Sequence, residues 1–232
     1  MKLSIIIPIL NEEKNIIPLT DKIRKVLKNV DYELIFVDDS SNDKSRKILK
    51  YLKNKFNFFK PILRNKDRDL TQSCFDGIKI AKFKNILIMD GDMQHDPKYI
   101  KKMFHQFEKN KNDIVIGARK LNIKNKGLSE TRRFISNILI FLFKIFKIKT
   151  TDPMSGFFLF KKEIYFKSKN NYFGKGFKIL ADILINSKSE LKTEDVYIDF
   201  KRRYESKSKM NFKILIILIQ FYLRSIFKKL FI

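Results

Sequence analysis

The sequence predicts an α/β fold in which helices flank a mainly parallel sheet, with two further amphipathic helices late in the chain. Three observations lead to this class. Short runs of consecutive apolar residues alternate with longer segments of helical period, as in doubly wound parallel sheets. Apolar residues make up 44% of the 232, enough for one large domain with a substantial core. Polar and charged residues follow directly after the apolar runs, where ligands of such sheets bind.

The first elements alternate in type along the chain. LSIIIPI (3–9) and ELIFV (33–37) are continuous apolar runs of strand length, which is typical of strands covered on both faces. Helical spacing predicts helices over 12–29 and 41–55, and the second opens with serine, asparagine and aspartate, which are common N-caps. KPILR (60–64) predicts a short strand.

The alternation continues with a helix over 70–83 and a strong strand at NILIMD (85–90). A helix is predicted over 96–110, with Pro97 in its first turn, where no backbone donor is lost. DIVIG (113–117) is the next predicted strand.

Candidate ligand-binding residues follow these strands. They are Asn11 and Glu12, Asp38 and Asp39, Asp90 and Asp92, and Arg119. Because the carboxyl ends of parallel strands meet at one edge of a sheet, we expect these side chains to surround a single ligand site.

The loop MDGDMQHDP (89–97) admits four interpretations: a metal site, a general acid/base pair, a cluster of N-caps, or a solvated turn. Asp90 and Asp92 are carboxylates one residue apart, which can share Mg²⁺ or Mn²⁺ and the phosphates that it carries. Gly91 between them permits a close approach of the backbone to a ligand.

Three later residues of the loop have separate interpretations. Gln94 and His95 could complete a coordination sphere, although a histidine beside a metal turn is more often a positioning group. Asp96, directly before a proline, is interpreted as a helix N-cap. His95 is therefore not assigned as a catalytic base.

The positive charge of the chain is segregated. The formal net charge is +25, from 50 basic and 25 acidic residues, and so large an excess indicates a polyanionic partner, either nucleic acid or an anionic membrane. Residues 1–40 hold 6 basic and 7 acidic residues, whereas 119–149 and 201–232 each hold 9 basic and 1 acidic. A lysine-rich genome alone would not concentrate the charge in this way.

Other features bear on the compartment. Cys74 is the only cysteine, which excludes an internal disulfide and a cysteine zinc site and fits a reducing cytoplasm. The apolar run near the start is too short for a signal peptide and is followed by acidic residues. No segment reaches the roughly 20 apolar residues that span a bilayer. We therefore expect a peripheral or monotopic protein at the cytoplasmic face of a membrane.

Two phenylalanine- and isoleucine-rich stretches, 138–148 and 214–223, are candidates for helices that lie on the membrane. On a helical wheel of about 100° per residue, the polar residues of each stretch form a narrow stripe. The stripes are Arg133, Ser136, Asn137, Lys144 and Lys147 in the first helix, and Lys213, Gln220, Arg224 and Lys228 in the second.

A thin basic stripe on an apolar helix suits a helix half sunk in a membrane, and the alternative is a core helix with one wet edge. The predicted organisation is one domain over 1–210, which includes an interface helix over about 133–148, and a C-terminal membrane-associating helix over 211–232.

Seven motifs occur in the order found in glycosyltransferase family 2, which the chain resembles over nearly all of residues 3–210. They are SIIIPILNEEKNI, VDDSSNDKS, RDLTQSCFDGIKIA, MDGDMQHDP, VIGAR, TDPMSGFFLFKKE and VYIDFKRRYESKSK. Within that family the chain is similar to dolichol- or polyprenol-phosphate mannose synthases of the catalytic-domain-only type. The resemblance implies a Rossmann-like GT-A fold and inverting transfer of mannose from GDP-mannose to a polyprenyl phosphate, such as a dolichyl or undecaprenyl phosphate.

The resemblance also implies roles for individual residues. Contacts with the nucleotide sugar are implied for Pro8, Leu10, Glu12, Val37, Asp39, Asp90, Gly91, Asp92, Arg119, Arg203 and Lys209. Lipid-phosphate binding is implied for Arg119, Arg132 and Ser136, and a metal site for Asp92 and Gln94. The implied catalytic residues are Asp92, Arg119, Arg203 and Lys209.

The acceptor chemistry is consistent with these roles. A phosphate monoester has a second pKa near 6, so it is largely dianionic at neutral pH and needs no strong general base. Cations must instead offset the repulsion between two anions and the charge on the leaving diphosphate. Two positions depart from the family pattern: Leu10 replaces the usual aromatic residue, and Ser206 replaces the glycine of the closing loop.

Other functions remain open. The same fold could transfer glucose or another sugar from a UDP-sugar to undecaprenyl phosphate. A basic nucleic-acid-binding protein is disfavoured, because the strand ends are acidic and the charge lies on apolar helices. A membrane scaffold with a decayed site is disfavoured because the motif acids and arginines are nearly all present. The expected partners are thus a nucleotide sugar, a polyprenyl phosphate, an anionic membrane surface and a small membrane protein, with no nucleic acid.

Overall fold

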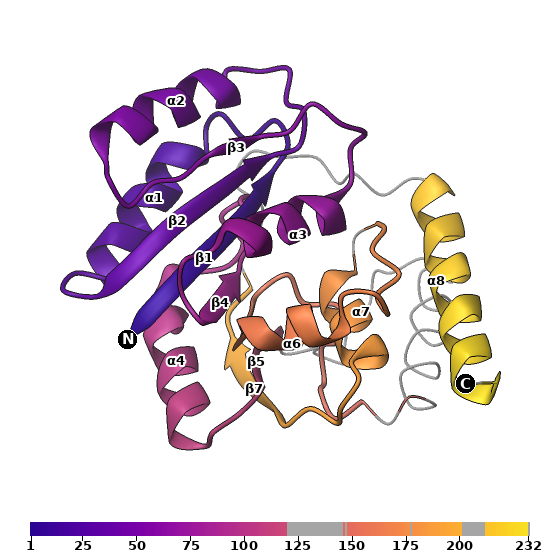
Figure 1. Cartoon of the computed structure of the whole chain (residues 1–232). Helices are drawn as coiled ribbons and strands as arrows, with labels where there is room; N and C mark the ends of the chain where they lie inside the picture. Colours follow the sequence, from indigo (N-terminus) through magenta and orange to yellow (C-terminus); the bar gives the residue numbers. More distant parts are fainter. Residues whose placement is uncertain (120–145, 147, 177, 201–211, 232) are drawn as a thin grey trace, which may run out of the picture.

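A computed structural model describes residues 1–119, 146, 148–176, 178–200 and 212–231. At its centre is a seven-stranded sheet of order β3-β2-β1-β4-β6-β5-β7 (Figure 1). The strands are β1 (Lys2–Ile9), β2 (Asp31–Asp38), β3 (Ile62–Leu63), β4 (Asn85–Ile88), β5 (Ile114–Arg119), β6 (Phe158–Lys161) and β7 (Thr193–Ile198). β6 pairs antiparallel with β4 and β5, and the other pairs are parallel. The predicted mainly parallel α/β sheet is confirmed.

Helices cover both faces of the sheet (Figure 1). They are α1 (Ile16–Val26), α2 (Ser45–Lys55), α3 (Leu70–Ile80), the 3₁₀ turn η1 (Pro97–Tyr99), α4 (Ile100–Lys109), α6 (Lys162–Ser168), α7 (Ile179–Asn186) and α8 (Phe212–Phe231). One apolar cluster joins the sheet to α1, α2 and α4, and a second joins it to α3, α6 and α7.

β1 shows why its sequence is continuously apolar. Ile5 and Ile7 belong to the cluster with α1, α2 and α4, whereas Ile6 belongs to the cluster with α3. Successive side chains of a strand point to opposite faces, and here each face is covered by helices. All three side chains are fully buried, as the sequence predicts for a strand covered on both sides.

Several element boundaries differ from the prediction, and three of the differences lie at the ligand edge of the sheet. The predicted helix over 12–29 begins only at Ile16, because Glu12 to Asn15 form a turn in which the Asn15 N–H donates to the Glu12 carbonyl at 2.8 Å. The predicted strand over 85–90 ends at Ile88, so Asp90 lies in a loop rather than in the sheet. The helices predicted over 41–55 and 70–83 are shorter in the structure, at Ser45–Lys55 and Leu70–Ile80.

Two predictions about helix starts have different outcomes. Asp96 is confirmed as an N-cap, since its carboxylate accepts from the Lys98 N–H at 3.1 Å in the turn that precedes α4. The N-cap position of α2 is Lys44, not one of the predicted residues, and its side chain makes no capping bond. Asp43 nevertheless accepts from the Ser45 N–H at 2.9 Å, so it satisfies one donor of the first turn.

The helix predicted over 133–148 lies almost wholly outside the described residues. Its described residues are Phe146, which lies in a turn, and Ile148, which is in no regular element, so the predicted helix does not reach residue 148. Both pack beside Phe221 and Tyr222 of α8. These two side chains therefore contribute to a small apolar cluster with α8 instead of facing outward from a helix.

α8 lies along one side of the structure next to α7 (Figure 1). Its inner face holds the buried residues Phe221, Tyr222 and Ser225. None of the described helices combines the length and the apolar character that crossing a bilayer requires.

Candidate functional site

The carboxyl edge of the sheet gathers the described candidate residues. Glu12 follows β1, Asp39 follows β2, and the loop with Asp90 and Asp92 follows β4. Arg119 is the last residue of β5. Because β4 and β5 both pair antiparallel with β6, they run in the same direction, and their carboxyl ends lie at the same edge. In the part of the chain that the structure describes, these residues therefore lie at one edge of the sheet, and that they surround a single ligand remains a prediction.

Pro8 and Val37 are neighbours across the β1–β2 pair. Both residues are buried in the sheet, and the Val37 side chain packs in the cluster with α3. A nucleotide at this edge would meet their backbone rather than their side chains. Leu10, at the end of β1, is half-buried and leaves part of its side chain at the edge.

Asp39 forms a buried ion pair with Arg64, which the sequence analysis did not single out. The Arg64 guanidinium also donates to Ser73 Oγ at 2.9 Å and to Asp76 Oδ2 at 3.1 Å. Burial raises the pKa of the Asp39 carboxyl, while Arg64 opposes that rise. Arg64 thus ties the end of β2 to α3, and the motif KPILR gave no sign of this role because its partners are distant in sequence.

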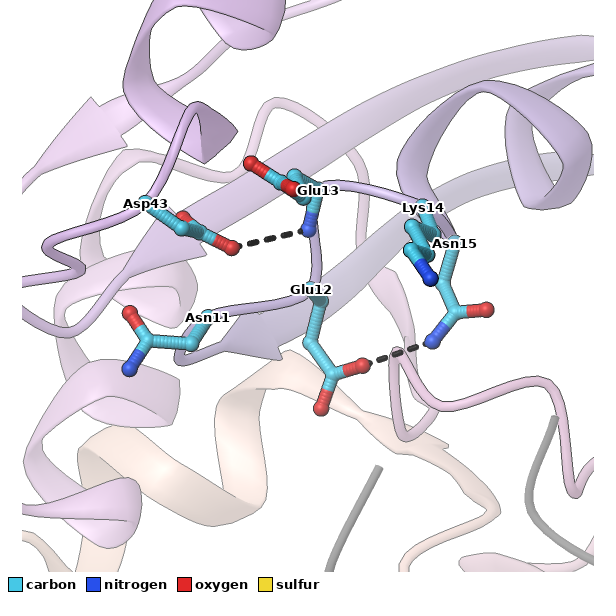
Figure 2. Close-up of a pocket in the computed structure, with 6 residues that line it drawn as sticks. All are labelled: Asn11, Glu12, Glu13, Lys14, Asn15 and Asp43. Atoms are coloured by element: carbon cyan, nitrogen blue, oxygen red, sulfur yellow. Dashed lines mark hydrogen bonds between the residues drawn. The ribbon is translucent and has the colours of Figure 1, made fainter. Parts of the chain in front are cut away.

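Glu12 lies in a small polar pocket between the loops that follow β1 and β2, as Figure 2 shows. The pocket is lined by Asn11, Glu12, Glu13, Lys14, Asn15 and Asp43. Glu12 accepts from Asn15 Nδ2 at 2.7 Å, and the Glu13 N–H donates to Asp43 Oδ2 at 3.1 Å (Figure 2). The two loops are therefore joined by hydrogen bonds, and their acidic side chains offer acceptors to a ligand.

Asp90 lies directly against Gly156. Ile88, two residues before Asp90, and Phe158, two residues after Gly156, are partners in the antiparallel β4–β6 ladder, so the same register brings Asp90 opposite Gly156. A Cβ built on Gly156 would lie 2.5 Å from Asp90 Oδ1 and closer still to Oδ2. The carboxylate can occupy its position only because residue 156 has no side chain.

Asp92 is buried and closes a tight turn, in which its Oδ1 accepts from the Gln94 N–H at 3.2 Å. Met93 between them has φ +65°, an unusual conformation for a residue with a side chain. Packing also requires glycine at position 91, because a Cβ there would lie 2.6 Å from Ile9 Cγ2. This requirement is separate from the predicted approach of a ligand to the backbone.

The carboxylates of Asp90 and Asp92 fit a divalent cation of the oxygen-preferring kind. The described residues contain no cluster of three or more histidine, cysteine, aspartate or glutamate side chains arranged for a metal. Mg²⁺ is commonly held by one or two carboxylates together with substrate phosphates, so a two-carboxylate site is sufficient. Gln94 is half-buried in the same turn and remains a candidate ligand.

His95 is a buried residue of the same loop. Its ring stacks on Phe157 with centroids 5.2 Å apart and tilts against Phe200 at 5.4 Å. Nδ1 lies 3.6 Å from Asp90 Oδ2 and has no hydrogen-bond partner among the described residues. Burial lowers the pKa of His95 to about 4, so the ring is neutral at neutral pH.

Arg119 is held by Asp152, a residue that the sequence analysis did not assign. Nε and Nη2 of Arg119 donate to the two carboxylate oxygens at 2.6 and 2.8 Å, and the Arg119 N–H donates at 3.2 Å. Asp152 is 2% exposed, so the carboxylate that holds Arg119 is buried. The hydrogen bond to Asp152 raises the pKa of Arg119, and its guanidinium lies 5.2 Å from the Phe200 ring centroid.

Lys178 is a further cation near the site that the sequence analysis missed. Its side chain is half-buried, and burial together with the nearby Arg119 lowers its pKa to about 8, whereas Asp90 and Asp152 raise it. The available sequence signal was the segment GKGFK, in which two glycines precede a lysine at the start of a helix.

Four predicted residues fall outside the described part of the chain. They are Arg132, Ser136, Arg203 and Lys209. Their assignments to the lipid phosphate and to the donor remain predictions.

Comparisons with known proteins agree with the resemblance seen in the motifs. Residues 4–167 match the family model described as Glycosyl transferase family 2. The dolichol-phosphate mannosyltransferase of Pyrococcus furiosus is 35% identical over 92% of this chain, which spans 60% of that protein. The dolichol-phosphate mannosyltransferase of Saccharomyces cerevisiae is 30% identical over 94% of this chain and 84% of its own length.

A solved structure has a similar fold. Glucosyl-3-phosphoglycerate synthase from Mycobacterium tuberculosis, in complex with Mn²⁺, UDP-glucose and phosphoglyceric acid, aligns with a TM-score of 0.70. The alignment covers 97% of this chain and 77% of that one at 14% identity, so the likeness concerns the fold alone.

Proposed function

The chain belongs to glycosyl transferase family 2, and we propose that it transfers mannose from GDP-mannose to a polyprenyl phosphate at the cytoplasmic face of a membrane. The observation that carries the proposal is the arrangement at the carboxyl edge of the sheet. Two carboxylates, Asp90 and Asp92, lie on one loop, and the negative charge of Asp90 acts on two cations, Arg119 and Lys178, whose pKa values it raises. The two mannosyltransferases that are similar over most of the chain support the choice of sugar and acceptor.

Asp92, with Asp90 and Gln94 beside it, would hold a divalent cation, Mg²⁺ or Mn²⁺, together with the donor diphosphate. When bound, the cation would offset the charge that develops on the leaving diphosphate. Gly156 leaves room for the Asp90 carboxylate, and the His95 ring lies beside it, with Nδ1 at 3.6 Å from Asp90 Oδ2.

Arg119 and Lys178 would offset the repulsion between the donor and a dianionic acceptor phosphate. The bidentate bond to Asp152 fixes the Arg119 side chain before substrates arrive. No general base is required, because the acceptor is already deprotonated at neutral pH. Arg132, Ser136, Arg203 and Lys209 are proposed to complete the acceptor site and to close it.

The outer face of α8 supports the proposed location at a membrane. Ile216, Ile219, Leu223 and Phe227 are exposed and recur at helical spacing, which makes one apolar stripe. Arg224, beside that stripe, is exposed as well. An apolar stripe with basic neighbours suits a helix that lies on an anionic bilayer surface.

A nucleotide-binding measurement tests the donor part of the proposal. Purified protein is titrated with GDP and with UDP, in Mn²⁺ and in metal chelator, alongside the variants Asp92→Asn and Asp96→Asn. We expect metal-dependent binding that favours GDP and is lost in Asp92→Asn. Asp96→Asn is the matched control, because Asp96 is an acid of the same loop that caps a helix. Preferential UDP binding would move the proposal to a UDP-sugar donor, and binding of neither nucleotide would contradict it.

A further inference from the structure

The loop that joins α6 to α7 is hydrogen-bonded to a side chain of α7. The N–H groups of Phe173 and Gly174 donate to the two oxygens of Asp182 at 3.0 and 2.8 Å. Asp182 is buried and also accepts from Asn186 Nδ2 at 2.8 Å. Burial raises the pKa of Asp182, and these hydrogen bonds oppose the rise.

The same loop is also hydrogen-bonded to residues at the N-terminus of α3. The Gly176 N–H donates to Asp69 Oδ2 at 2.8 Å, while Thr71 Oγ1 donates to the Gly176 carbonyl at 2.9 Å. Gln72 Nε2 donates to the Gly174 carbonyl. Asp69 also caps α3 by accepting from the Gln72 N–H at 3.0 Å, so one carboxylate fixes both the helix and the loop. The motif RDLTQS therefore has a structural role about 100 residues away in sequence.

The path of the loop depends on glycine at two positions. Gly174 has φ +69° and Gly176 has φ +86°, a region that residues with side chains rarely adopt. Two glycines in this conformation, each with its backbone hydrogen-bonded, define a single course for the chain. Lys178, two residues after Gly176 in the sequence, is the N-cap position of α7.

Lys178 lies in an unusual setting for a lysine. Its side chain is half-buried, and its ammonium makes no hydrogen bond or ion pair with any of the described residues. Two carboxylates, Asp90 and Asp152, raise the pKa of Lys178. Asp152 is paired with Arg119, and the Asp90 carboxylate lies against Gly156. Partly removing an ammonium from water without a partner is costly, so the arrangement favours an anion brought by a ligand.

We propose that this loop positions Lys178, and that Lys178 binds a phosphate oxygen of a substrate at the carboxyl edge of the sheet, near Asp90. This inference rests on the proposed function, because it takes the ligand from that reaction. A lysine ammonium is a compact charge with three donors, which suits a single phosphate oxygen, whereas the fork of Arg119 is already occupied. The phosphate belongs either to the donor diphosphate or to the acceptor monoester.

The test compares Lys178→Met with Lys175→Met and Lys178→Arg. Lys175 is an exposed lysine of the same loop and serves as the matched control. Thermal unfolding of each variant is recorded first, so that a loss of folding is separated from a loss of binding. Affinity for GDP and for UDP in Mn²⁺ and the KM for a short polyprenyl phosphate are then measured.

Lys178→Met is expected to lower kcat/KM by roughly 100-fold, which is the usual effect of removing one donor that stabilises charge in the transition state. Lys178→Arg should recover part of the activity, and Lys175→Met should behave as wild type. A weaker nucleotide affinity assigns Lys178 to the donor diphosphate, and an unchanged nucleotide affinity with a raised acceptor KM assigns it to the acceptor phosphate. Wild-type nucleotide affinity, acceptor KM and kcat in Lys178→Met would overturn the inference.

The nucleotide titrations keep this inference separate from the proposed reaction. If the wild-type protein transfers no mannose but binds a nucleotide diphosphate, the proposed function fails while the donor assignment of Lys178 is still tested. If wild type is active and the three lysine variants are indistinguishable from it, the proposed function stands and Lys178 has no role.

Discussion

The contact between Asp90 and Gly156 gives the sharpest prediction about the site. In Gly156→Ala, the new Cβ would lie 2.5 Å from Asp90 Oδ1 and closer still to Oδ2, whereas ordinary van der Waals contact begins at 3.4 Å. The carboxylate must therefore move by about 1 Å, and a displacement of about 1 Å in an active site can cost about 100-fold in rate. A 100-fold loss corresponds to about 2.7 kcal/mol of transition-state stabilisation.

The assay is kcat/KM for sugar transfer by wild type, Gly156→Ala, Asp90→Asn and the double variant. Because the glycine acts through Asp90, Gly156→Ala should have little further effect once Asp90 is replaced, and the two effects should not add. Ser155→Ala is the neighbouring control; it removes a 2.8 Å bond to the Gly117 carbonyl but leaves Asp90 room. Full activity in Gly156→Ala, or additive losses in the double variant, would refute the reasoning.

Three further predictions follow from particular contacts. Asp152→Ala should lower the free energy of unfolding by about 2 kcal/mol in urea, because the hydrogen bonds to the Arg119 guanidinium are lost, and it should also reduce kcat. Asp69→Ala should destabilise the fold by about 1 kcal/mol in the same measurement, because α3 loses its N-cap. The pair Leu223→Glu and Phe227→Glu, at positions 63% and 61% exposed on α8, should weaken co-sedimentation with anionic vesicles at least tenfold without changing the thermal midpoint.

Each of these has a control that isolates the stated cause. Thr151→Ala, beside Asp152, should leave kcat unchanged, since its hydroxyl bonds Asp195 instead of Arg119. Asp67→Ala, close to Asp69 on an exposed part of the chain, should leave stability within about 0.5 kcal/mol of wild type. Phe166→Glu, an exposed aromatic residue on α6, should leave vesicle binding intact. Equal vesicle binding by all variants would contradict a membrane role for α8.

The sequence predicted the part of the fold that depends on local pattern. The runs around Ile6 and Ile35 had the length and apolar content of buried strands, and both are buried in the sheet. The acidic pairs that follow the strands indicated the ligand edge, because strand direction in a parallel sheet fixes where their ends meet.

The sequence did not predict what depends on pairing between distant segments. β6 enters the sheet antiparallel between β4 and β5, and no local period in FFLFK distinguishes that pairing from a parallel one. Gly156 meets Asp90 only through this register, and Arg119 meets Asp152 across 33 residues. Lys178 is brought to the site by a loop anchored about 100 residues away, at Asp69.

The central claim is sugar transfer to a polyprenyl phosphate at the edge that carries Asp90 and Asp92. The most direct measurement follows label from GDP-mannose and, separately, from UDP-glucose into the organic phase, with Mg²⁺ or Mn²⁺ and a short polyprenyl phosphate. We predict label from GDP-mannose, loss of that label in Asp92→Asn, and its retention in Asp96→Asn. Label from UDP-glucose alone would keep the site and change the donor. Transfer that survives Asp92→Asn, or no transfer from either donor in the presence of membranes, would contradict the claim.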